Sequence, residues 1–262
     1  MLTVASQCLS IPGIVFDEVA STIEQHPYMI ASTKLRNFTN MIQHMHEMEE
    51  WDDACWALVQ SRHQYFTGES PYEVYWRTLV FNRDKFQKEP TNEFGRLYAI
   101  WMSMYITFNQ LTEQVRQLGT LKTQLEQASA SWEKSTIFGK LWRFWSVFAH
   151  LWAFSKALLL VKLKLETVQK LDREAKPFDE AFKAYSMGRK MFSTSAGFIG
   201  WAPFDARIGD KMCVFRNYKL PFIIRRCGNE YRLVGDCYLH GLMDMSDEEW
   251  ETIGRTEDIL LI

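Results

Sequence analysis

The sequence has few of the features that mark secreted or metal-binding proteins. Only five of its 262 residues are cysteines, and no two of them form a Cys-x-x-Cys pair. Scattered cysteines in odd number are typical of reduced thiols, so we expect a cytoplasmic protein without a disulfide framework. The formal net charge of -2 gives no global attraction for nucleic acid or for a membrane. We therefore expect no nucleic-acid partner.

Segments typical of a signal peptide or a membrane span are also missing. The first sixteen residues carry no charged side chain and are interrupted by Pro12 and Gly13. A signal peptide needs a basic segment, so we expect two strand segments with a break at Pro12-Gly13 instead. The longest internal uncharged run, residues 97–112, is shorter than the roughly 20 apolar residues of a span. No transmembrane helix is predicted.

Motifs of known catalytic and phosphate-binding sites are absent, including Gly-x-Gly, Gly-x-Ser-x-Gly and His-Glu-x-x-His. His44 and His46, with His63 nearby, are metal-ligand candidates, but residues two apart on a helix point in different directions. Cys237 and His240 are candidates for a nucleophile and a base, but residues three apart on a strand face opposite sides. We predict no catalytic residue, no metal, no cofactor and no enzymatic activity.

Helical patterns fill most of the first two thirds of the chain. Apolar residues recur at helical spacing between Met41 and Val59, and the acidic residues of 47–53 are predicted to form a solvated face. The segment Ser70-Pro-Tyr-Glu73 is a capping box with proline at the first helical position, which predicts a helix to about Arg83. A longer helix is expected after Pro90, followed by a connection over 129–139.

A further helix is predicted over residues 141–165, which are rich in Trp, Phe and Leu and carry several lysines. One hypothesis is a helix that binds a membrane surface or a partner protein. The other is a core helix whose lysines reach outward to water, and we favour this second interpretation. Pro177 is predicted to end the helical pattern, with a last helix from Phe178 to about Arg189.

From Gly188 onward, short apolar runs separated by Gly, Pro and Asn predict strands and turns. A Gly228-Asn229 turn would place Phe222, Ile224, Tyr231 and Leu233 toward the core and two arginines on the other face. Residues 246–249 form a second capping box, and 258–262 predict a final strand. We expect an α+β protein. Residues 1–187 would form a helical body with a short N-terminal strand segment, and residues 188–262 a small β-barrel or curled antiparallel sheet.

Four linked motifs in this region resemble the C-terminal region of fungal heterokaryon-incompatibility (HET) domain proteins. They are Arg189-Lys-Met-Phe-Ser-Thr-Ser-Ala-Gly-Phe-Ile-Gly-Trp-Ala-Pro203, Gly209-Asp-Lys-Met-Cys-Val-Phe215, Pro221-Phe-Ile-Ile-Arg225 and Tyr231-Arg-Leu-Val-Gly-Asp-Cys-Tyr-Leu-His-Gly-Leu-Met243. Upstream, residues 75–79 and 11–17 are similar to further family segments. The Ser-Tyr-x-Trp-Gly segment that is typical of the HET domain itself is not found in this chain.

The resemblance implies the accessory region of a self/non-self recognition protein, acting as an interaction or regulatory module with a protein partner. The alternative is a peripheral membrane module that uses residues 141–165. We interpret the family-motif residues as structural positions: Trp76, Arg77, Gly197, Gly200, Gly209, Asp210, Pro221, Arg225, Gly235, Tyr238, His240 and Gly241. Candidates for contact with an anion or a partner surface are Arg225, Arg226 and Arg232.

Overall fold

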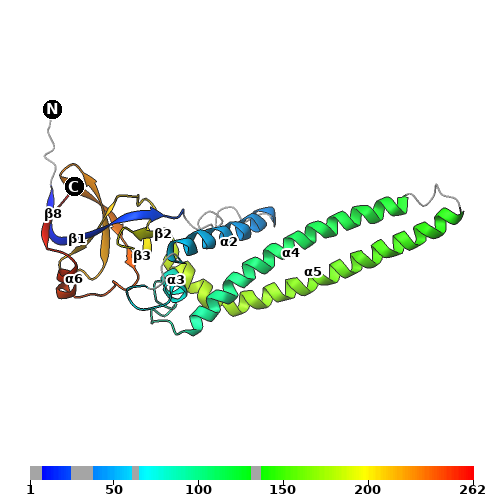
Figure 1. The fold of residues 1–262 in the computed structure, drawn as a ribbon, viewed down its shortest axis with the longest axis horizontal. Coiled ribbons are helices and arrows are strands. Elements are labelled where there is room, and N and C mark those ends of the chain that lie inside the picture. The colour runs from blue at the N-terminus through cyan, green and yellow to red at the C-terminus, as the bar shows by residue number, and fades with distance from the viewer. Residues whose placement is uncertain (1–7, 25–37, 61–64, 131–136) are drawn as a thin grey trace, which may run out of the picture.

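The computed structural model describes residues 8–24, 38–60, 65–130 and 137–262. It is an α+β protein in which a sheet lies against a helical body, and two long helices project from that body (Figure 1). The helices are α2 (Phe38–Gln60), α3 (Pro71–Leu79), α4 (Glu93–Ala130), α5 (Ile137–Ser186) and α6 (Asp247–Ile253). The strands are β1 (Leu9–Thr22), β2 (Arg189–Thr194), β3 (Ile199–Pro203), β4 (Lys211–Phe215), β5 (Pro221–Cys227), β6 (Glu230–Asp236), β7 (Tyr238–Leu239) and β8 (Glu257–Leu261).

These strands form one mixed sheet in the order β4-β5-β6-β8-β1-β2-β3-β7. Strand β1 also pairs with β4, so the pairings of β1, β4, β5, β6 and β8 return on themselves. All pairs are antiparallel except β6–β8, which is parallel. The predicted C-terminal sheet is confirmed, and it also includes a strand from near the start of the chain. The predicted division at residue 187/188 grouped that strand with the helices.

Strand β1 continues through Pro12 and Gly13, so the predicted break is wrong. The fixed φ of proline is compatible with an extended strand, and the Pro12 carbonyl accepts a hydrogen bond from the Arg216 amide at 2.9 Å. The strand has register shifts further along, between Val15 and Asp17 and between Val19 and Ser21. Such bulges bend a strand, and here they let β1 pair with β4 and β8 first and with β2 at its end.

The β5–β6 hairpin has the predicted register, with Ile224 opposite Leu233 and Arg225 opposite Arg232. Leu233 is nevertheless 45% exposed, so its assignment to the core is wrong. The register shifts between Ile223 and Ile224, and both of these residues are fully buried. This bulge interrupts the regular alternation on which the prediction depended.

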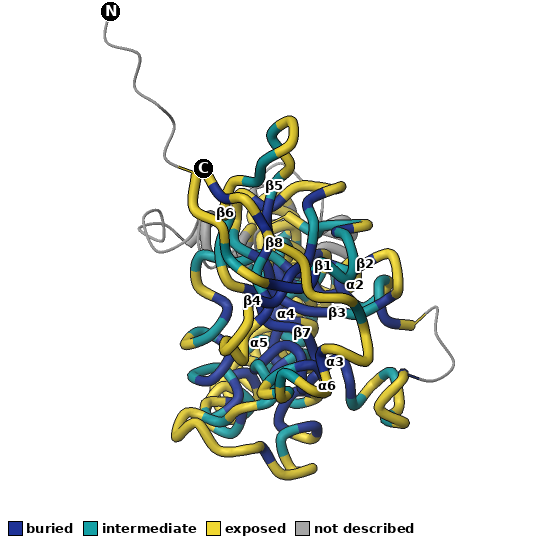
Figure 2. The backbone as a smooth tube through the Cα atoms, turned by 90° about the vertical axis from the view of Figure 1, so that its left-hand side faces the viewer, coloured by how far each residue is buried: buried dark blue, intermediate teal, exposed yellow. Residues whose placement is uncertain are grey.

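The helical body and the sheet share one core. The largest cluster of buried apolar residues joins α2, α3, α4 and the end of α5 to strands β2, β3 and β7. Trp201 from β3 stacks on Trp51 from α2, with ring centroids 6.0 Å apart, and its Nε1 donates to the Thr78 carbonyl at 2.8 Å. Figure 2 shows the buried backbone as a central layer through sheet and body. We conclude that the two parts pack as one unit.

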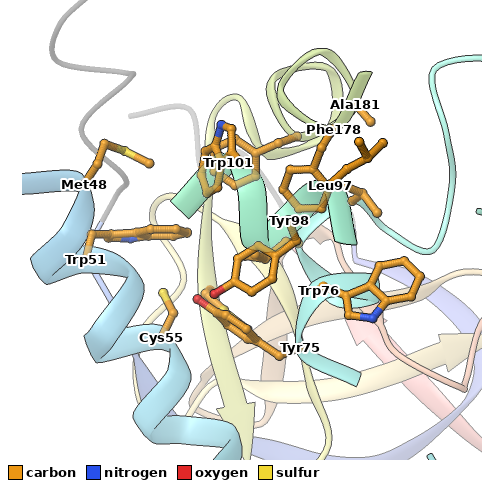
Figure 3. Packing of buried hydrophobic residues seen from close by; sticks show 14 of the residues in the cluster. Met48, Trp51, Cys55, Tyr75, Trp76, Leu97, Tyr98, Trp101, Phe178 and Ala181 are labelled. Atoms are coloured by element: carbon orange, nitrogen blue, oxygen red, sulfur yellow. The ribbon is translucent and has the colours of Figure 1, made fainter. Parts of the chain in front are cut away.

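One acidic residue of α2 belongs to this core, contrary to the predicted solvated face. Asp52 is only 5% exposed and accepts hydrogen bonds from the hydroxyls of Tyr75 at 2.7 Å and Tyr98 at 2.9 Å. Figure 3 shows the hydroxyl ends of these two tyrosines close together beside α2. Burial raises the pKa of Asp52 to about 6, and the two hydroxyls oppose that shift. Glu50 and Asp53 are exposed, as predicted.

Both predicted helix starts are confirmed. The Ser70 hydroxyl accepts from the Glu73 amide at 3.2 Å, and Pro71 is the first helical residue of α3. At α6 both halves of the capping box are present between Ser246 and Glu249. These side chains satisfy amides that have no partner within the helix.

Helix α5 differs from the prediction in two ways. It runs unbroken through Pro177, although proline inside a helix costs about 3 kcal/mol. Phe178 and Phe182 are fully buried just after it, and this packing offsets the lost hydrogen bond. In addition, ten large apolar side chains of 144–165 are exposed and none of the most apolar window is buried, so the favoured interpretation as a core helix is wrong. Of the predicted connection over 129–139, residues 131–136 lie outside the described residues, and the rest is helical.

Candidate functional site

Arg77 joins three segments at the end of α3. Its side chain is 9% exposed, and its guanidinium lies 2.9 Å from the Glu73 carboxylate and 3.3 Å from the Glu69 carboxylate. Its Nη1 donates to Asn82 Oδ1 at 2.8 Å and to the Pro90 carbonyl at 3.2 Å. The planar, multidentate guanidinium suits this geometry, and a lysine ammonium would not. Arg77 therefore holds the loop over 81–92 against the helix.

His240 connects the sheet to the Glu69 carboxylate, which also lies beside Arg77. Its Nε2 lies 2.7 Å from Glu69 Oε2, and its Nδ1 lies 3.0 Å from the Tyr238 hydroxyl. The Nε2 atom can donate to the Glu69 carboxylate, and the Tyr238 hydroxyl can donate to or accept from Nδ1. The hydrogen bond from His240 is the main reason that the pKa of Glu69 falls to about 2. We call Glu69, Arg77, Tyr238 and His240 the junction network, because it ties the upstream motif to the last one.

A tyrosine–histidine–carboxylate chain can also move protons in enzymes. In this protein Tyr238 and His240 are 3% and 2% exposed, and burial raises the pKa of Tyr238 well above its usual value. The neighbouring Cys237 is also buried, and its Sγ contacts the Pro221 carbonyl at 3.4 Å. Burial raises its pKa well above that of an ordinary thiol, whereas reactive cysteines have a lowered pKa. The buried hydrogen bonds of Tyr238 and His240 form a clamp between the sheet and the segment before α3.

The other motif positions shape the backbone or pack the interior. Gly200 lies so close to β7 that an added Cβ would be 1.8 Å from the Tyr238 carbonyl oxygen. The indole of Trp76 stacks under the Arg77 guanidinium at 4.6 Å. Four motif glycines have positive φ, namely Gly197, Gly209, Gly235 and Gly241. A side chain at these positions would cause steric conflict or strain.

Of the three arginines predicted to contact an anion or a partner, Arg225 already has a carboxylate. Its Nε and Nη2 each lie 2.8 Å from an oxygen of Asp210, which is itself 3% exposed. This bidentate pair neutralises the charge of Arg225. Arg226 donates to the Gly228 carbonyl at 3.0 Å, and Arg232 is exposed. A partner contact by these two residues stays a prediction.

A cleft of about 560 Å³ lies beside the junction network, where the loop after α3 meets the segment after β7. We call it the junction cleft. It is lined by Phe81, Asn82, Arg83, Gln87, Glu89, Tyr185, Leu220, Asp236, Cys237, Tyr238, Gly241, Met243 and Asp244. Its rim is crossed by an ion pair between Arg83 and Asp244 at 3.1 Å, and both side chains are about half exposed.

Phe81 lines this cleft in an unusual backbone conformation. The amides of Phe81 and Asn82 bond to the carbonyls of Thr78 and Arg77, which is the Schellman pattern at a helix C-terminus. Glycine usually occupies the left-handed position of that motif, but here it is Phe81, with φ of 56°. Its ring stacks on Tyr238 at 4.6 Å and on Tyr185 at 5.5 Å. These aromatic contacts offset the backbone strain.

Strained backbone is concentrated at this cleft. Among the described residues, five other than glycine have positive φ, and four of the five line the cleft. They are Phe81, Asn82, Gln87 and Asp244. Such conformations cost about 1–3 kcal/mol each and gather at sites where function requires them. We therefore take the junction cleft as the candidate functional site.

Among the described residues, no group of three or more His, Cys, Asp or Glu could hold a metal ion. Of the metal-ligand candidates, His46 is exposed and lies 3.4 Å from Glu50. The side chain of His44, and His63 as a whole, lie outside the described residues.

Comparison with known proteins agrees with the motifs. Residues 161–262 match the model of the Het-6 beta-barrel domain. The C-terminal part of the chain is HET-related. Heterokaryon incompatibility protein 6, OR allele, from Neurospora crassa is 30% identical over 79 residues, which is 29% of this chain and 11% of that protein. The match thus spans about a tenth of the relative's length. No solved structure matches this chain.

The HET-related region contains the sheet strands from β2 onward and the final part of α5. Sequence reasoning singled out Arg77, Tyr238 and His240 as structural positions of the motifs. It missed Glu69, which joins them, and Phe81 and Arg83, which line the cleft. Glu69 lies one residue before the N-cap of α3, and Phe81 and Arg83 lie just after the end of that helix. These positions were the only local signal.

Proposed function

We propose that this chain is a non-enzymatic interaction module of a heterokaryon-incompatibility type protein, and that a protein partner binds in the junction cleft. The observation that carries the proposal is the strained backbone at the cleft, formed by four of the five positive-φ residues named above. The last HET-related motif, residues 231–243, supplies one wall of the cleft, and the loop that follows α3 supplies the other. Residues that hold a binding surface in a costly conformation favour a role in recognition.

The chemistry of the cleft supports a polypeptide as its ligand. Its floor is aromatic, with Phe81 stacked on Tyr238, while Arg83, Glu89, Asp236 and Asp244 place both signs of charge around it. A polyphosphate or nucleic acid would meet repulsion from the three carboxylates. A peptide segment can supply an apolar side chain for the floor and paired polar groups for the rim.

The proposal places the protein in the cytoplasm. Cys55, Cys213, Cys227 and Cys237 form no disulfide among the described residues, which supports a reducing compartment. The proposal includes no reaction, because the nucleophile and base candidates are buried within the clamp described above.

The test uses a photo-crosslinking residue at Leu220, which lines the cleft and is 41% exposed, and the same residue at Ile253, 38% exposed and outside it. In fungal extract we expect a defined protein adduct at position 220 and not at 253. The partner so identified, once purified, should bind the intact chain directly. Equal adducts at both positions would contradict the proposal.

A charge reversal then locates the contact. Arg83→Glu breaks an exposed ion pair worth at most about 1 kcal/mol, so the fold should persist, and we expect at least a tenfold weaker complex, about 1.4 kcal/mol. The matched control is Arg116→Glu, an exposed arginine paired with Glu113 on α4, which should leave binding unchanged. Equal effects of the two variants would count against the cleft.

A further inference from the structure

The outer part of α5 presents a wide apolar surface to solvent. Beyond the helical body, α4 and α5 run side by side (Figure 1). We call residues 110–130 and 137–165 the arm. Ten apolar side chains of its α5 half are between 43% and 64% exposed: Phe144, Trp145, Phe148, Leu151, Trp152, Leu158, Leu159, Leu160, Leu163 and Leu165. The helix is long and apolar enough to cross a membrane, and none of its most apolar window is buried.

The width of this surface indicates what kind of phase covers it. At 3.6 residues per turn, the ten side chains spread over about 220° of the helix circumference. A seam against one partner helix uses about two positions in seven, which is a much narrower stripe. The remaining side of α5 packs toward α4, where Lys164 donates to Gln110 at 2.9 Å. A surface this wide fits a continuous apolar phase better than a single docked helix.

The charges of residues 134–165 indicate that the apolar phase has an anionic surface. Residues 134–165 contain no Asp or Glu, and they contain six basic residues: Lys134, Lys140, Arg143, Lys156, Lys162 and Lys164. Lys156 lies over the ring of Trp152, with its Nζ 5.6 Å from the centroid. Exposed Trp, Phe and Leu together with Lys and Arg are the composition of helices that lie in the headgroup region of anionic bilayers.

The α4 half of the arm argues against a helix that crosses the bilayer. It carries exposed ion pairs, Glu113 with Arg116 and Lys122 with Glu126. Because α4 runs alongside α5, a crossing arm would bring these charges into hydrocarbon at high cost. An arm lying flat keeps them on the water side while α5 faces the lipid.

We propose that the α5 face of the arm binds an anionic lipid bilayer, with the helix lying parallel to the surface in the headgroup region. Most of this face precedes residue 161, where the match to the Het-6 beta-barrel domain begins. The proposal does not depend on the junction cleft, which lies at the other end of α5 near Tyr185.

The experiment is flotation of the intact chain with phosphatidylcholine vesicles, with and without phosphatidylserine. We expect binding to the mixed vesicles that weakens as salt is raised, because salt screens charge attraction. The double variant Trp145→Glu/Trp152→Glu removes side chains that are 62% and 64% exposed, and it should reduce partitioning at least about tenfold. Circular dichroism should show an unchanged fold, since neither indole is buried.

The matched control is Phe204→Glu/Ile208→Glu, which changes two side chains that are 62% and 68% exposed outside the arm. It should float like the unmodified chain. A second variant, Lys156→Glu/Lys162→Glu, keeps the apolar surface and should remove the preference for phosphatidylserine. The proposal is overturned if the unmodified chain binds neither vesicle, or if Trp145→Glu/Trp152→Glu floats as well as Phe204→Glu/Ile208→Glu. It is also overturned if the arm instead drives self-association that Trp145→Glu/Trp152→Glu disperses.

Discussion

Replacing Arg77 with methionine should destabilise the fold by about 3 kcal/mol. Methionine fills a similar space but donates no hydrogen bond, so the Glu73 carboxylate and the Pro90 carbonyl lose their donor. Removing one partner of a buried ion pair costs about 3–5 kcal/mol. Glu73 is 32% exposed and can regain some water, which places the expected loss at the lower end. For a chain of this size that corresponds to a melting temperature lower by about 6–12 °C.

The assay is urea unfolding, followed by near-ultraviolet circular dichroism, which reports on the aromatic core. Arg116→Met is the control, because Arg116 is 74% exposed and ion-paired on the surface of α4; it should change stability by no more than about 0.5 kcal/mol. Arg77→Lys should fall between the two, since it keeps the charge and loses the planar donor geometry. If Arg77→Met is as stable as Arg116→Met, the reasoning about the junction network is wrong.

Four further predictions concern packing, pH and thiol reactivity. Gly200→Ala should cost at least about 3 kcal/mol in a thermal melt, because its Cβ would overlap the Tyr238 carbonyl, whereas Gly119→Ala, which meets open space, should stabilise α4 by up to about 1 kcal/mol. The folded pKa of Asp52, about 6, is above its ordinary value of 3.8, so stability should fall as pH rises between these values, and Asp52→Asn should remove that loss. Glu69 has the opposite sign: its folded pKa of about 2 is below 4.5, so its contribution is present above pH 4.5 and lost as pH falls toward 2, and Glu69→Gln should flatten that acid limb. With a thiol reagent at neutral pH, the exposed and half-exposed cysteines should react quickly and the buried ones slowly; the quick pair is Cys8 and Cys227, and the slow set is Cys55, Cys213 and Cys237.

Specific results would contradict the predictions on Gly200, Asp52 and the cysteines. Equal melting temperatures for Gly200→Ala and the unmodified chain would contradict the close approach of β3 and β7. If the stability curves of Asp52→Asn and the unmodified chain run parallel between pH 4 and 6, the burial of the Asp52 carboxylate is contradicted. Five thiols of similar reactivity before unfolding would contradict the burial pattern around β4 and β7.

Features set by neighbours in the sequence were predictable. Each cap depends on residues three apart, as at Ser70 and Ser246, and the Gly228-Asn229 turn fixed the hairpin register. The α+β class followed from where glycine and proline interrupt the apolar pattern. In all these cases the partner of a residue lies within a few positions, so local rules are sufficient.

Features set by distant partners were not predictable. Glu69 and His240 are 171 positions apart, and nothing near either residue identifies the other. The helix propensity of Pro177 is overridden by the burial of Phe178, and Asp52 is held inside by two tyrosines from other helices. Tertiary packing decides these positions, and its contribution exceeds the local preference of about 3 kcal/mol or less.

Strand β1 imposes an order of events on biosynthesis. It leaves the ribosome well before two of its neighbours, β4 and β8, which lie far downstream in the sequence. Until those strands emerge, the nascent strand has unsatisfied backbone donors and acceptors and must be kept from pairing with other chains. For the same reason, a gene fragment limited to residues 161–262 would encode a sheet without β1 and with its former neighbours unprotected.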